Sequence, residues 1–148
     1  MAGAGTVTYA ITHIETDARP SGKGGFKVLT FTCVGDSSGG GIPDTTIDAQ
    51  TTIQLTGCYL IKVQMVPLSG GTGPTANSDV YIKDANTIDL LDGNGVDKLD
   101  NATNSEAYAQ IDGQPALQPI VGALTLNVTG DTVASAAYSI ICIFVSTR

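Results

Sequence analysis

Apolar and polar residues alternate along much of this chain with the two-residue period of β-strands. In the segment 6–15 the side chains of Val7, Tyr9 and Ile11 fall on one face, and mainly threonines fall on the other. The same period predicts further strands at 26–34, 57–67, 78–83 and 122–128. The final apolar segment, 137–145, is too continuous for an exposed edge, so we expect it to be a central or covered strand.

Weaker patterns suggest how the remaining segments are organised. The threonine-rich segment 45–55, with Ile47, Ile53 and Leu55, is predicted to be a strand, and 88–91 a short second strand after a turn at 84–86. Some helical character is found in 100–109, where Asn104 or Ser105 could cap one turn. Glycine, proline and serine punctuate 16–25, 35–44 and 68–77, which we expect to be loops, the second of them flexible.

Many short strands separated by turns, with almost no helix, predict an all-β fold. We expect an antiparallel β-sandwich of about eight strands, jelly-roll or immunoglobulin-like, with a slight preference for the jelly roll. The predicted organisation is a single domain over 1–148, with a flexible N-terminal arm at about 1–6. Several strands have apolar residues on both faces, as 26–34 does, so we infer that another subunit or a larger surface covers part of the outside.

The composition narrows the range of partners. The chain has 148 residues, a formal net charge of −7 and only 14% charged residues, which argues against direct binding to nucleic acid phosphates. No apolar run reaches the roughly 18 to 20 residues of a membrane span. The first residues, MAGAGTVTYA, lack the features of a secretory signal, so we expect synthesis in a cytoplasm.

Residues for catalysis are scarce, and we predict that the protein is not an enzyme. The single histidine, His13, lies in a strand-like segment, and Ser37 and Ser38 in GDSSGG do not form the G-x-S-x-G nucleophile pattern. The three cysteines, Cys33, Cys58 and Cys142, are widely spaced in apolar or threonine-rich segments, so buried free thiols are favoured over a disulfide or a metal site. We expect no catalytic, metal or cofactor residues.

A series of acidic residues between 79 and 100 is the one constellation with possible chemistry. Asp92, Asn94 and Asp97 could offer oxygen ligands to calcium around glycine turns, although their spacing is not that of an EF-hand loop. Asp and Asn also suit turns for reasons unrelated to metals, and that interpretation is favoured. Tyr81 and Tyr108 could line a shallow carbohydrate site, but tyrosine in a strand is more often a packing residue.

The C-terminal half of the chain resembles small structural proteins of tailed bacteriophages. The resemblance lies in SDVYIKDANTIDLLDGNGVDKLDNATNSEAY, followed by GALTLNVTGDTVASAAYSIICIFV. The matching residues are Asp84 or Asp89, Leu90, Leu91, Gly93 and Gly95, and then Gly122, Leu124, Thr125, Leu126, Val128, Thr129 and Gly130. None of these residues is a specific functional motif, and the N-terminal half matches only in its strand pattern.

This resemblance implies a virion component, most simply a capsid decoration or cement protein. Such proteins commonly form trimers on the outer surface of a head and clamp neighbouring shell subunits, so the implied partners are the major capsid protein and other copies of this chain. The alternatives are a tail, neck or fibre component of the virion, and a carbohydrate-binding β-sandwich module. Because a protein that binds only the assembled shell shifts the equilibrium toward it, stabilisation requires no catalysis.

Overall fold

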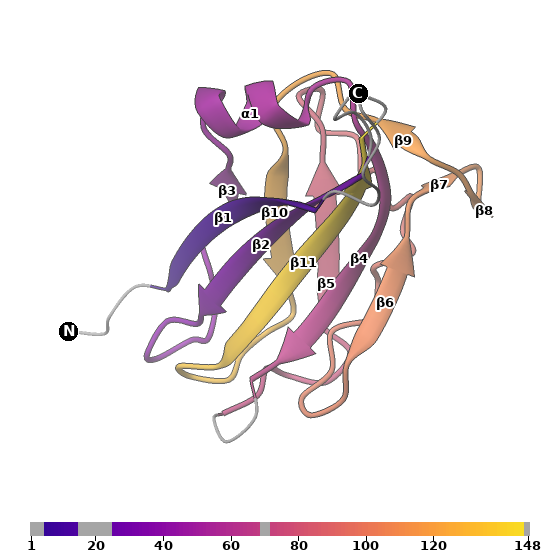
Figure 1. Ribbon diagram of the computed structural model, residues 1–148. Coiled ribbons are helices and arrows are strands. Elements are labelled where there is room, and N and C mark those ends of the chain that lie inside the picture. Colours follow the sequence, from indigo (N-terminus) through magenta and orange to yellow (C-terminus); the bar gives the residue numbers. More distant parts are fainter. Residues whose placement is uncertain (1–4, 15–24, 69–71, 147–148) are drawn as a thin grey trace.

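The computed structural model shows an all-β protein in which two antiparallel sheets pack face to face, and it describes residues 5–14, 25–68 and 72–146. In Figure 1 the strands of the larger sheet run diagonally across those of the smaller sheet, which lie behind them. The all-β antiparallel sandwich predicted from the alternation is therefore confirmed. Eleven strands form in the described residues, and four of them are two residues long.

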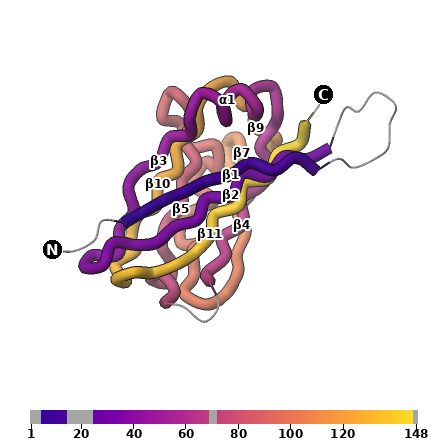
Figure 2. The backbone as a smooth tube through the Cα atoms, turned by 60° about the vertical axis from the view of Figure 1, so that its left-hand side comes forward, coloured from indigo at the N-terminus to yellow at the C-terminus, as the bar shows by residue number. Residues whose placement is uncertain are grey.

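The larger sheet has the strand order β1-β2-β11-β4-β6, with β9 also paired to β4. Four of its strands have nine residues each: β1 (Thr6–Ile14), β2 (Phe26–Val34), β4 (Tyr59–Pro67) and β11 (Ala137–Val145). The shorter strands are β6 (Ser105–Tyr108) and β9 (Gln118–Pro119). The apolar segment 137–145 forms β11, which lies between β2 and β4, so its prediction as a central strand is confirmed. Figure 2 shows β1 at the rim of this sheet, beyond β2.

The smaller sheet has the order β3-β10-β5, formed by Thr45–Thr46, Thr125–Thr129 and Asp79–Lys83. A separate two-stranded hairpin joins β7 (Gln110–Ile111) to β8 (Gln114–Pro115). The core lies between the two sheets, where alternate side chains of each strand meet. Its largest fully buried side chains include Tyr138, Phe31 and Phe144 from the larger sheet and Ile82 and Leu124 from the opposite side.

The strand predicted at 45–55 is wrong beyond its first two residues. After β3 the chain forms the helix α1 (Ala49–Leu55), capped by Asp48, whose carboxylate accepts a hydrogen bond from Thr51 N at 2.8 Å. Thr51 and Leu55, four residues apart, are its buried positions, whereas Ile53 is 71% exposed. The N-cap and this helical spacing outweigh the weak strand preference of the threonines.

One other strand prediction is also wrong, and the weak helical pattern at 100–109 does not form a helix. The segment 88–91 forms turns rather than a strand, with a single bridge between Lys83 and Asp89. The helical turn considered at 100–109 is instead β6, in which Ala107 pairs with Val63 of β4 and is fully buried. Pairing with a long strand satisfies the backbone of this short segment better than an isolated turn would.

Of the predicted loops, 16–25 lies almost wholly outside the described residues, as do 69–71 of the third, whereas the loop at 35–44 is described and is closed by specific contacts. Asp36 N donates to Gly41 O at 2.9 Å, and the Asp36 carboxylate accepts from Ser38 N and Gly39 N at 2.6 Å each. Gly40 has a φ of 78° and lies against the backbone of Val133, so a side chain would not fit there. Of the predicted N-terminal arm at 1–6, residues 1–4 lie outside the described residues, and Thr6 already belongs to β1.

Candidate interaction surface

Three carboxylates of the acidic segment, those of Asp84, Asp89 and Asp100, accept hydrogen bonds from backbone N–H groups of their own turns. Asp89 accepts hydrogen bonds from Ile82 N at 3.2 Å, Leu91 N at 3.1 Å and Gly93 N at 2.9 Å. Asp84 accepts from Asn86 N at 2.8 Å and from Ile88 N at 3.0 Å. These contacts support the interpretation of the segment as a set of turns, since each acceptor satisfies donors that a turn leaves unpaired.

Two of the three candidate calcium ligands accept hydrogen bonds from amides distant in the sequence. Asp92 Oδ2 accepts from Gly113 N at 2.9 Å, and Asn94 Oδ1 accepts from Tyr108 N at 2.7 Å, so these oxygens tie the turn to other parts of the chain. Asp97 has a φ of 59° and contacts Asp79 through its own backbone N–H. No group of three His, Cys, Asp or Glu side chains placed to hold a metal is found in the part of the chain that the structure describes.

The residues considered for catalysis are far apart. His13 pairs with Lys27 near one end of β1, whereas the other end pairs with Val34, directly before the loop that holds Ser37 and Ser38. Seven residues of strand separate the two ends, about 23 Å at the usual rise per residue. His13 and these serines therefore cannot form one catalytic group.

His13 lines a small cleft at the end of the sandwich beside α1. The cleft has a volume of about 170 Å³, and Lys27, Ile53, Gln54 and Cys58 are among its other lining residues. The Lys27 ammonium donates a hydrogen bond to the Gln54 carbonyl across it. This volume is below the roughly 300 to 1,000 Å³ of typical small-molecule pockets.

The cysteines have the structural role that was favoured from the sequence, whereas Tyr108, expected to be a packing residue, is 46% exposed. Cys33, Cys58 and Cys142 are free and buried, which confirms the prediction of unpaired thiols in the core. Tyr81 is in β5 of the smaller sheet and Tyr108 in β6 of the larger one, so they do not share a strand ladder or one sheet face. The Lys83 ammonium lies 5.6 Å from the centre of the Tyr81 ring.

The broadest unoccupied feature is the outer face of the larger sheet. In Figure 1 this face is turned toward the viewer, and no described element crosses it. The strand registers place on it the alternate residues that point away from the core, and the large apolar ones are Ile14, Phe26, Val28, Val34, Tyr59, Val66, Tyr108, Ile141, Ile143 and Val145. Threonine and serine side chains lie between them, so the face is apolar and hydroxyl-bearing.

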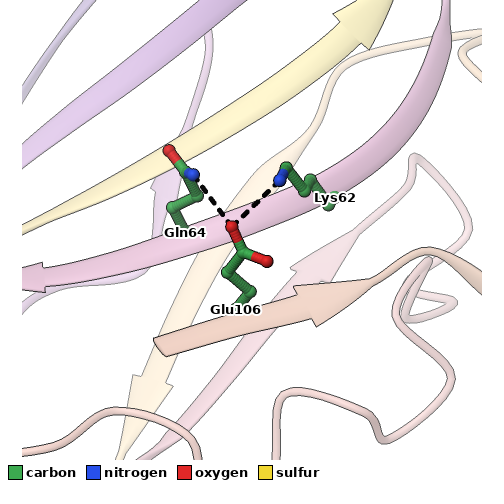
Figure 3. Close-up of polar contacts among 3 residues, drawn as sticks. All are labelled: Lys62, Gln64 and Glu106. Atoms are coloured by element: carbon green, nitrogen blue, oxygen red, sulfur yellow. Dashed lines mark hydrogen bonds and ion pairs between the residues drawn. The ribbon is translucent and has the colours of Figure 1, made fainter. Parts of the chain in front are cut away.

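The charges on the outer face neutralise one another. Lys62 from β4 and Glu106 from β6 form an ion pair with an N–O distance of 2.9 Å, and Gln64 Nε2 donates to the same carboxylate oxygen at 3.0 Å (Figure 3). The bonds from Gln64 and Lys62 hold the pKa of Glu106 below its usual value, and the bond to Glu106 raises the pKa of Lys62. We define the outer face as this side of β1, β2, β11, β4 and β6.

A neutral face is unusual for a chain of this charge. The protein has a formal net charge of −7, yet Glu106 is the one carboxylate on the outer face among the residues that the structure describes. The acidic residues lie instead on loops and on the smaller sheet, as Asp36, Asp79 and Asp89 do. Two acidic molecules repel each other least where their surfaces carry no net charge.

Sequence reasoning found the apolar strands of this face but not the polar contact between β4 and β6. Lys62 and Glu106 are 44 positions apart, and β6 was not predicted as a strand, so nothing local indicated that they would meet. Comparison of the chain with protein-family models, with curated proteins and with solved structures finds no match. None of the helices in the described ranges is long and apolar enough to span a membrane.

Proposed function

We propose that this protein is a non-enzymatic virion component that binds the assembled head of a tailed bacteriophage and stabilises it, as a decoration or cement protein. The observation that carries the proposal is the outer face of the larger sheet, which is broad, apolar and neutral on an acidic molecule. The resemblance of the C-terminal half to phage structural proteins supplies the class of partner.

The size of the outer face suits a protein interface. Four nine-residue strands, spaced about 4.8 Å apart with a rise of about 3.3 Å per residue, cover roughly 600 Å² in projection. A standard interface buries about 800 Å² on each partner, so this face and its adjoining loops are large enough for a specific contact. We propose that it contacts either other copies in a trimer or the shell itself.

The proposal predicts that phage heads carrying the protein disassemble at a higher temperature than heads without it. A free concentration of about 100 times Kd stabilises the bound state by about 2.7 kcal/mol per site. Light scattering or calorimetry of heads with and without added protein measures the effect. Equal disassembly temperatures, or no binding to heads, would contradict the proposal, and a copy number fitting a tail or neck would favour that alternative.

A matched pair of variants tests whether the outer face is responsible. Ile141→Lys places a charge in the middle of the face, between Thr30 and Gln64, and should weaken head binding. Gln114→Lys adds the same charge at an exposed position of the β7–β8 hairpin and should bind as the original protein does. Thermal unfolding of both variants confirms that they are folded, and equal binding by the two would exclude the outer face.

A further inference from the structure

The free edge of β1 is the longest sheet edge without a backbone partner in the described chain. Its nine residues pair on one side with β2, from Thr6 opposite Val34 to Ile14 opposite Phe26. In an antiparallel pair about half of the backbone N–H and C=O groups point away from the partner strand. Outside this ladder, no backbone hydrogen bond of Thr6–Ile14 is found within the described ranges.

The other edges of the two sheets are short or closed. The outer edge of β5 is covered by the segment that follows it: Val80 N donates to Gly95 O at 3.0 Å, and Leu90 N donates to Ile82 O at 2.8 Å. The strands β6 and β3 have only four and two residues. Among the described strands, β1 is therefore the one long edge that is left open.

β1 also lacks the residues that keep exposed edges apart. Its sequence, TVTYAITHI, contains no Lys, Arg, Asp, Glu or Pro, the residues with which soluble proteins usually block pairing between edges. On its core side Val7, Tyr9 and Ile11 pack against the core but remain partly exposed. A further strand beside β1 would cover them.

A second copy of β1 fits this edge. If two β1 strands pair antiparallel about a twofold axis at Ala10, Thr8 lies opposite Thr12, and Tyr9 lies opposite Ile11. Paired threonines, and an aromatic opposite a β-branched residue, are favourable cross-strand neighbours, and no like charges meet. Nine residues on each strand would form about nine backbone hydrogen bonds, close to the number of about ten in a typical interface.

We propose that β1 pairs with β1 of a second copy of this chain, joining their two larger sheets into one continuous antiparallel sheet. The contact is isologous, because the same residues contribute from both sides. It goes beyond head binding and does not depend on it. The proposed trimer would use the outer face and this contact uses the edge, so the pairing predicts an even number of chains in each particle.

The test is the mass of the full-length protein in solution, measured by light scattering or sedimentation. Ala10→Lys places two ammonium groups directly opposite each other at the twofold axis, and the mass of the particle should fall by half. The Ala10 side chain lies on the outer face, so Thr32→Lys, which adds the same charge at an exposed position of that face on β2, is the control and should not halve the mass. A mass that is the same for the original protein and Ala10→Lys would overturn the proposal.

A cysteine variant checks the register independently. Directly opposed residues have Cα atoms about 4.5 to 5.5 Å apart, so Ala10→Cys should form a disulfide between two chains under mild oxidation. Thr32→Cys, on β2 and on the same face, would be more than about 14 Å from its counterpart and should stay unlinked. Linkage of both variants at the same rate would overturn the proposal. Hydrogen exchange of the original protein gives a second check: if the β1 amides are protected only when heads are added, β1 does not pair with a second copy in solution.

Discussion

At the scale of single residues, the main finding is that acidic side chains act as acceptors for backbone N–H groups. Asp36, Asp48 and Asp100 each bind amides of the turn or helix that follows, and these hydrogen bonds hold the pKa of each carboxyl below its usual value of 3.8. A lowered pKa means that the ionised form stabilises the fold. That contribution is fully present above about pH 4 and is lost as the pH falls through the lowered pKa values.

Asp89 is the residue for which this role can be tested most directly. Asp89→Asn replaces an acceptor of three N–H groups with an amide that can accept at only one oxygen, and we expect a loss of about 2 kcal/mol in the free energy of unfolding. Urea denaturation measures it. Asp97→Asn is the control, because Asn tolerates the positive φ of 59° and the Asp97 carboxylate binds none of these turn amides; its effect should be within about 0.5 kcal/mol.

The same control bears on calcium. If Asp97 were a ligand, calcium would raise the unfolding temperature of the original protein, and Asp97→Asn would reduce that rise. We expect no difference in unfolding temperature with and without calcium for either protein, because the candidate oxygens of Asp92 and Asn94 are bound to amides of distant residues. A rise in unfolding temperature with calcium that is seen in the original protein but not in Asp97→Asn would show that calcium binds at Asp97.

At the scale of elements, the short helix α1 depends on its cap more than on its composition. It has seven residues, too few to be stable alone, and two threonines among them are poor helix formers. Asp48 caps the helix through its carboxylate, and its backbone N–H donates to the Tyr9 hydroxyl of β1 at 2.8 Å. The cap and this contact to the larger sheet are what select helix over strand.

Removing the cap should loosen α1 without unfolding the sandwich. For Asp48→Ala we expect hydrogen exchange at the Thr51 and Thr52 amides to be roughly 2- to 10-fold faster, the usual size of a lost N-cap. Acidification below about pH 4 should lower the protection factors of the same amides in the original protein, after correction for the slower intrinsic exchange, since the pKa of Asp48 is lowered by the bond from Thr51. Gln50→Ala, exposed on the same helix, is the control, and equal exchange in the two variants would contradict the role of the cap.

At the scale of the whole molecule, the core between the sheets is the source of stability, and its thiols can report on it. Cys33 and Cys142 are fully buried on neighbouring strands. Burial raises the pKa of the Cys33 thiol to about 12 and also raises that of Cys142. A thiol must ionise and be reached by reagent to react, so both should be inert in the folded protein.

We therefore predict that alkylation of Cys33 and Cys142 at neutral pH proceeds only through global unfolding. Their rates should rise together with added urea in proportion to the unfolded population. Cys58 is 4% exposed and lines the cleft beside α1, so it should react first, through local opening of the helix. Mass spectrometry of partly alkylated protein gives the order, and early modification of Cys142 would show that the core opens locally.

The predictions that were correct concern patterns whose physical cause is local. Alternation in 26–34 gave β2 with its predicted bounds, and continuous apolarity in 137–145 marked β11 as central. The free cysteines were also predicted correctly, because they lie in strand-like segments that become buried. Among the site residues, the turn role of Asp89 and its neighbours could be anticipated because it depends on side chains within a few positions.

What the sequence determined by itself is which residues face the core, because a strand puts alternate side chains on opposite sides whatever its neighbours are. The tertiary structure alone decided the rest. Whether 45–55 became helix, whether 105–108 joined β4, and whether Glu106 met Lys62 and Gln64 depended on backbone and side-chain partners distant in the sequence. The tertiary structure also decided that the edge of β1 is open and that of β5 is covered. Whether a strand lies at an edge depends on the assembled sheet and not on the sequence of that strand.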